Sequence, residues 1–189
     1  MDRPRAARSG KLKVVGAVPA IERRSVIRLR TMPDERYFPA IKQLAEYEVW
    51  CNCRSLEAAG ELTAEQLFRR FSFGFQTIHA TLFHVVEVLQ TWSGCVASTI
   101  SKPPMLLYDP KMSLERLAEW NRELSGAFLA AIDASHDLKL LHRDRRIAQV
   151  LHLVTHGTHH RTQFITMLRL LGKDPPFEAG DFGGWSKGR

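Results

Sequence analysis

The sequence predicts an all-α protein and, more narrowly, a four-helix bundle. Four long segments repeat apolar residues at spacings of three and four, which is the period of a helix that buries one face. No segment shows the alternation of apolar and polar residues that is typical of strands. The chain has 189 residues, 44% hydrophobic and 25% charged, which suits one globular core and excludes wholesale disorder.

The first long helix is predicted at residues 34–59, where the apolar positions fall on one stripe. Gly60 follows it and suits a helix end, because glycine adopts the left-handed conformation without strain. Thr63 is typical of an N-cap for a short helix at residues 64–70. Residues 72–74, Ser-Phe-Gly, are predicted to form a break before the next long helix.

The second long helix is predicted at residues 75–96 and the third at 113–134, with three prolines in the loop at 101–110. The fourth is predicted at residues 144–171, because Asp144 is a suitable N-cap and Gly172 a suitable stop. Four helices of this length with shorter connections are the pattern of a four-helix bundle.

The excess of positive charge lies entirely at the N-terminus. Residues 1–31 contain nine Lys and Arg against two acids, whereas residues 32–189 contain 18 of each sign. Because the segment has prolines, glycines and no helical period, we expect a mobile extension, or residues upstream of a true start at Met32, rather than a DNA-binding arm. Three regions follow: the extension at 1–31, the bundle at 32–177 and a loose tail at 178–189.

Neither a membrane nor a nucleic acid is an expected partner. The longest apolar run of the N-terminal segment, residues 14–21, is shorter than the about 20 apolar residues of a membrane-spanning helix. Cys51, Cys53 and Cys95 form no CxxC pair, and so few cysteines in an odd number indicate a reducing compartment. A cytoplasmic location is therefore expected.

Four of the eight histidines fall within nine residues of the fourth predicted helix. His152, His156 and His160, the histidine ladder, follow at intervals of four and share one helix face. Two imidazoles at this spacing can bind one metal ion, but the ladder spans about 12 Å, so only one adjacent pair can do so. The spacing alone leaves open which pair binds.

A third ligand has to come from another helix, and His84 is the natural candidate. It lies in the middle of the second long helix among apolar neighbours, where an unpartnered imidazole would be costly. Bundles build metal sites from side chains of facing helices. His79 is instead interpreted as a hydrogen-bonded core residue, His136 and His142 as solvated, and His159 as a residue of the rim.

Three blocks of sequence together resemble the DinB/YfiT-like superfamily of metal-binding four-helix bundles. They are YEVWCN at residues 47–52, TIHATLFHV at 77–85 and HLVTHGTHHRTQ at 152–163, and the resemblance covers about residues 32–177. Glu48 and Thr155 replace asparagines of the family pattern, and Thr162 replaces a glycine. None of these departures removes a histidine.

The resemblance implies that His84, His156 and His160 bind the metal, with His152 lining the pocket. It also implies a divalent ion such as nickel, zinc or manganese, and a homodimer. Glu87 and Gln163, each three residues after one of these histidines, are candidates to support them. Three imidazoles leave coordination positions open, as in catalytic rather than closed structural sites.

Our leading hypothesis is a metal-dependent transferase or hydrolase that acts on a small molecule, with a low-molecular-weight thiol as a candidate co-substrate. The alternative is a non-catalytic metal- or ligand-binding bundle. A nucleic-acid-binding stress protein is the third hypothesis, suggested by the basic N-terminal segment and by the DNA-damage association of the family's name. That name gives no physical warrant for contact with DNA.

Overall fold

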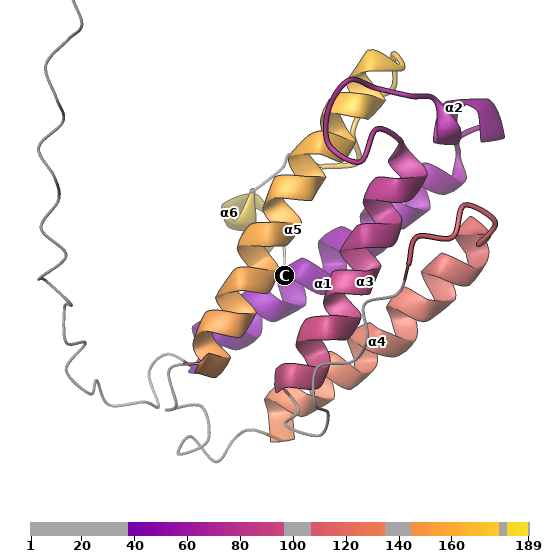
Figure 1. Ribbon diagram of the computed structural model, residues 1–189. Helices are drawn as coiled ribbons and strands as arrows, with labels where there is room; N and C mark the ends of the chain where they lie inside the picture. Colours follow the sequence, from indigo (N-terminus) through magenta and orange to yellow (C-terminus); the bar gives the residue numbers. More distant parts are fainter. Residues whose placement is uncertain (1–37, 97–106, 135–144, 178–180, 189) are drawn as a thin grey trace, which may run out of the picture. The chain divides into compact units, whose positions relative to one another are not determined.

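A computed structural model describes residues 38–96, 107–134, 145–177 and 181–188, and these residues form helices joined by turns and loops, without strands (Figure 1). The four long helices confirm the predicted all-α bundle. The expectations for residues 1–31, and for His136, His142 and the cap Asp144, lie outside the described residues. The helices are α1 (Phe38–Gly60), α2 (Ala64–Phe68), α3 (Ile78–Val96), α4 (Leu114–Ala134), α5 (Arg145–Leu170) and α6 (Phe182–Lys187).

The long helices pack so that α1 and α3 each contact both α4 and α5. The pairs α1/α3 and α4/α5 lie across the diagonals of the bundle and contact each other much less. Helices α3 and α5, which carry the predicted ligands, are therefore direct neighbours (Figure 1).

Local sequence signals account for several helix ends. The Thr63 hydroxyl accepts a hydrogen bond from the Gln66 backbone amide, and Gln66 Oε1 accepts one from the Thr63 backbone amide, which makes a capping box. Helix α5 ends at Leu170, and Gly172 just after it has a φ of 70°, a conformation that favours glycine. Both ends agree with the sequence prediction.

Two differences from the prediction bear on the site. Helix α3 begins at Ile78 rather than at Phe75, because residues 73–77 form a tight turn that includes positive φ angles at Gly74 and Gln76. The sequence pattern also does not predict α6, whose Phe182 and Trp185 rings both lie 5.4 Å from the ring of Tyr47 in α1.

The apolar core consists of two clusters separated by a polar layer. The first cluster is built around Leu56, Val86, Leu117 and Phe164, and the second around Ala45, Leu89, Phe128 and Leu153. In each long helix, buried polar residues lie between the two sets. They are Glu48, Asn52 and Ser55 in α1, Glu87 in α3, Asn121 and Ser125 in α4, and His160 and Arg161 in α5.

None of the described helices combines the length and the hydropathy that crossing a membrane requires.

Candidate metal centre

Three histidines from two helices meet at the polar layer. His84 of α3 and His160 of α5 each direct Nε2 toward Nε2 of His156, at 3.2 Å and 3.1 Å. The three candidate ligand atoms all lie within 4.8 Å of one another. The structure therefore brings together the three residues that the resemblance implied, and selects His156 and His160 as the pair of the ladder nearest to His84.

Supporting side chains fix which nitrogen of two imidazoles carries the proton. His84 Nδ1 donates to Glu87 Oε2 at 3.0 Å, and His160 Nδ1 donates to Gln163 Oε1 at 2.9 Å. In a neutral imidazole whose Nδ1 carries the hydrogen, Nε2 has a free lone pair. Two such lone pairs face His156, whose Nε2 can donate to only one of them.

This donor set fits a divalent metal ion. Zn–N distances of about 2.0–2.1 Å in a tetrahedral site place two ligand nitrogens about 3.3–3.4 Å apart. This is close to the 3.2 Å and 3.1 Å that separate His156 Nε2 from the Nε2 atoms of His84 and His160. Glu87 and Gln163 hold the ligand rings from behind, as outer partners of metal-binding histidines do. The residues could accordingly hold an ion with little rearrangement.

The electrostatics of the cluster favour neutral imidazoles, which are the form that binds metal. Burial, together with repulsion from the neighbouring histidines, lowers the pKa of His156 to about 4. Burial likewise lowers the pKa of His160 to about 4 and lowers that of His84. Near neutral pH the three lone pairs are therefore available without loss of protons.

The remaining histidines have other roles. His79 is buried, where Nε2 donates to the Met112 carbonyl and Nδ1 accepts from the Tyr108 hydroxyl, both at 2.9 Å. This confirms its interpretation as a hydrogen-bonded core residue. His152 is exposed, with its ring centroid 5.6 Å from that of His156. His159 is also exposed and its Nε2 accepts from the Gln163 amide.

Phe75 is a site residue that the sequence analysis placed wrongly, as the first residue of a helix. It lies instead in the turn at residues 73–77, with its ring centroid 4.2 Å from that of His84 and 5.4 Å from that of His160. Its side chain is nevertheless exposed, at 43%. Phe75 therefore forms a wall beside the histidines that is open to solvent on its other side.

Behind the histidines, α1 and α5 are joined by an ion pair inside the bundle. Arg161 NH1 donates to Glu48 Oε2 at 2.6 Å, and the two residues are 2% and 1% exposed. A second Arg161 nitrogen donates to Thr158 Oγ1 at 2.9 Å. Gly157 leaves room for the pair, because a Cβ there would collide with the Glu48 carboxylate. In the sequence, Glu48 stands out only as a departure from the family pattern, and no spacing predicts its contact with Arg161.

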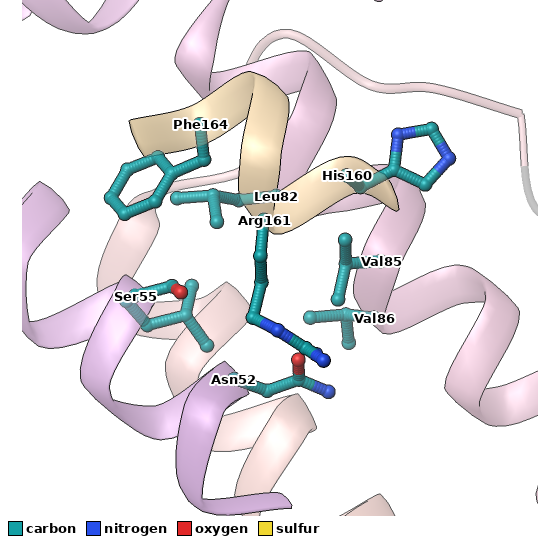
Figure 2. A pocket seen from close by; sticks show the side chains of 9 residues that line it. Asn52, Ser55, Leu82, Val85, Val86, His160, Arg161 and Phe164 are labelled. Carbon is teal, nitrogen blue, oxygen red and sulfur yellow. The ribbon is translucent and has the colours of Figure 1, made fainter. Parts of the chain in front are cut away.

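Figure 2 shows that Arg161 and His160, although adjacent in sequence, point in different directions. Arg161 runs toward Asn52 of α1, beside an internal cavity that apolar residues of α3 also line. The free space inside the cavity is very small. Because this is about the requirement of one water molecule, the cavity is too small for an organic substrate.

Comparison with known proteins agrees with the architecture and with the histidine cluster. Among curated proteins, no match to the chain is found. A family model, that of the DinB family, matches residues 32–182. This range includes α1 to α5, the three clustered histidines and the first residue of α6. The chain belongs to the DinB family.

Proposed function

We propose that His84, His156 and His160 bind one divalent metal ion and that the protein is a metal-dependent transferase or hydrolase acting on a small molecule. The observation that carries the proposal is the convergence of one ring nitrogen from each of three histidines within 4.8 Å of one another, on two neighbouring helices. Nickel, zinc and manganese are the candidate ions, since imidazole suits several first-row metals.

The side chains around the proposed ion have distinct roles. His84 and His160 present unprotonated Nε2 atoms because Glu87 and Gln163 hold the hydrogen on Nδ1. Three ligands leave positions free for a substrate, and a bound divalent ion supplies Lewis acidity that lowers the pKa of water or of a thiol there. The ring of Phe75 lies against one side of the cluster, next to His84 and His160.

Metal analysis tests the site. The purified protein, stripped with a chelator and incubated in turn with each candidate ion, is expected to retain about one ion per chain. His156→Ala and His160→Ala are expected to lose this binding, because each removes one of three ligands. His152→Ala is the matched control, since it changes the ladder residue of the same helix that is not a ligand, and it should bind as the wild type does.

Two results separate the alternatives. Stoichiometric metal in both ligand variants would contradict the site. Turnover in a screen of hydrolysis and thiol transfer, present with metal and absent in His156→Ala, supports the enzyme. Metal binding without turnover in that screen favours the non-catalytic metal-binding bundle.

A further inference from the structure

The turn at residues 73–77 holds Phe75 in a conformation that requires unusual backbone angles. Gly74 has a φ of 55° and Gln76 a φ of 67°, and Gln76 is the non-glycine residue with positive φ in the described chain. The Thr77 amide donates to the Phe75 carbonyl at 2.8 Å across only two residues. A three-residue turn with positive φ at its centre is rare and strained, and such strain concentrates at functional sites.

The turn is also tied to a side chain that supports the metal centre. Gly74 packs so closely on Gln163 that a Cβ at this position would lie 2.6 Å from Gln163 Oε1. That oxygen accepts the hydrogen bond from His160 Nδ1. Phe75 therefore keeps a fixed position relative to the cluster, with one part of its ring against two imidazoles and the rest open to solvent.

Three charged side chains of the described residues near the cluster have hydrogen-bond partners within the protein. Arg161 points into the bundle and is paired with Glu48 (Figure 2). Arg70 donates to the side chain of Gln76. Glu87 is 5% exposed and holds His84. Arg70 bonds a neutral amide and keeps its charge, but Phe75 is the described side chain of this turn that contacts two of the three imidazoles and is open to solvent.

We propose that Phe75 determines specificity at the metal centre by packing on a flat apolar group of the ligand. The inference rests on the proposed metal site and adds the class of ligand: a metal-binding head that carries an aromatic or similarly flat apolar group. Aromatic pairs contribute about 0.5–1.5 kcal/mol beyond their buried area, so loss of the ring is expected to cost up to about tenfold in affinity.

The test uses the full chain loaded with Co²⁺ and three probes that share one metal-binding head: acetohydroxamate, benzohydroxamate and succinate monohydroxamate. Binding is followed by the change in the visible absorption of cobalt. The wild type is expected to bind the phenyl probe about tenfold more tightly than the methyl probe. The carboxylate probe should gain nothing over the methyl probe.

Phe75→Ala and Phe75→Leu are expected to remove most of the preference for the phenyl probe while cobalt is still bound. Phe75→Leu keeps an apolar side chain of similar volume but has no flat ring. It therefore tests the role of the ring even if Phe75→Ala disrupts the turn. Trp92→Ala is the matched control: Trp92 packs on His152, with ring centroids 4.6 Å apart, and not on a proposed ligand. This variant should keep the preference.

The outcomes separate the two proposals. Absence of cobalt binding in the wild type would overturn the metal site and this inference with it. Cobalt binding with equal affinity for methyl and phenyl probes, or a preference that survives in both Phe75 variants, would overturn the inference alone. A preference for the carboxylate probe would also overturn it.

Discussion

Gly74 is a single residue on which the geometry of the site depends. Two features require glycine at this position. Its φ is positive, which a residue with a Cβ adopts only with strain, and a Cβ would also collide with the Gln163 side chain. Gly74→Ala is therefore expected to lower the free energy of unfolding by about 1–2 kcal/mol for the left-handed conformation, with a further cost for the clash. Because Gln163 would have to move from His160, metal affinity should fall about tenfold or more.

Gly172→Ala is the matched control for this prediction. Gly172 also has a positive φ, of 70°, but a Cβ there would meet nothing within 4 Å. It should lose stability in urea titrations and keep its metal affinity in isothermal calorimetry. Equal metal affinities in the two variants would show that the Gly74–Gln163 contact does not support His160.

The histidine cluster predicts a specific dependence of stability on pH in the metal-free protein. His156 and His160 have pKa values of about 4, below the 6.5 of an exposed histidine, mainly because they are buried. Between these values the unfolded chain binds more protons than the folded one, so the free energy of unfolding should fall as pH falls from about 6.5 to about 4. Urea titrations of chelator-treated protein across this range measure the slope.

His156→Ala should flatten this slope, because it removes one of the buried groups whose pKa is lowered to about 4. The exposed ladder residue provides the control, and His152→Ala should keep most of the slope. A steep slope that is the same in all three proteins would assign the acid sensitivity to other groups.

At the scale of helices, the Glu48–Arg161 pair fixes α5 against α1. The pair joins residues 113 positions apart, and it lies directly behind His160. Glu48→Ala leaves a buried arginine without its partner, a change that typically costs about 3–5 kcal/mol. Chemical denaturation should show this loss, and Gly157→Ala should show a related one because its Cβ would displace the carboxylate.

A double variant distinguishes the charge from the packing. In Glu48→Met/Arg161→Met no buried charge is left unpaired, and apolar replacements of a buried pair are often neutral or stabilising. It should recover most of the stability that Glu48→Ala loses. A double variant as unstable as the single one would mean that shape, rather than an unpaired charge, accounts for the loss.

The helices themselves were largely predictable, because a buried face imposes its period on the sequence. The start of α3 was not, since Phe75 continues the apolar pattern and the turn that excludes it depends on contact with Gln163. Helix α6 has only six residues, and its aromatic rings pack on Tyr47 of α1. Contacts between segments far apart in the sequence do not change the spacing of apolar residues within a segment, so this spacing does not predict them.

The candidate site was only partly predictable, because the spacing of residues describes one helix at a time and not how two helices face each other. Spacing identifies the histidine ladder but treats its two adjacent pairs alike, because both share one face of a helix. The register of α3 against α5 decides between them, and it places His84 beside His156. The pairing of Glu48 with Arg161 likewise depends on which faces α1 and α5 present to each other, which spacing within one helix does not reveal.

At the scale of the whole bundle, a polar layer divides the core into two apolar clusters. Buried polar groups stabilise a fold only when they are paired, and the histidines reach the outer side of this layer. A metal ion bound there would join α3 to α5 in the middle of the bundle. Metal binding is therefore expected to stabilise the whole domain rather than one helix.

Ligand linkage gives the size of this effect. At a free metal concentration of 100 times the dissociation constant, binding adds about 2.7 kcal/mol, which for a domain of this size raises Tm by about 5–10 °C. Calorimetric scans with and without a chelator measure the shift. His84→Ala should abolish it although both histidines of α5 remain, because the ligand from α3 is what joins the helices. A shift that persists in His84→Ala and disappears in His152→Ala would instead place the ion on the ladder of α5 alone.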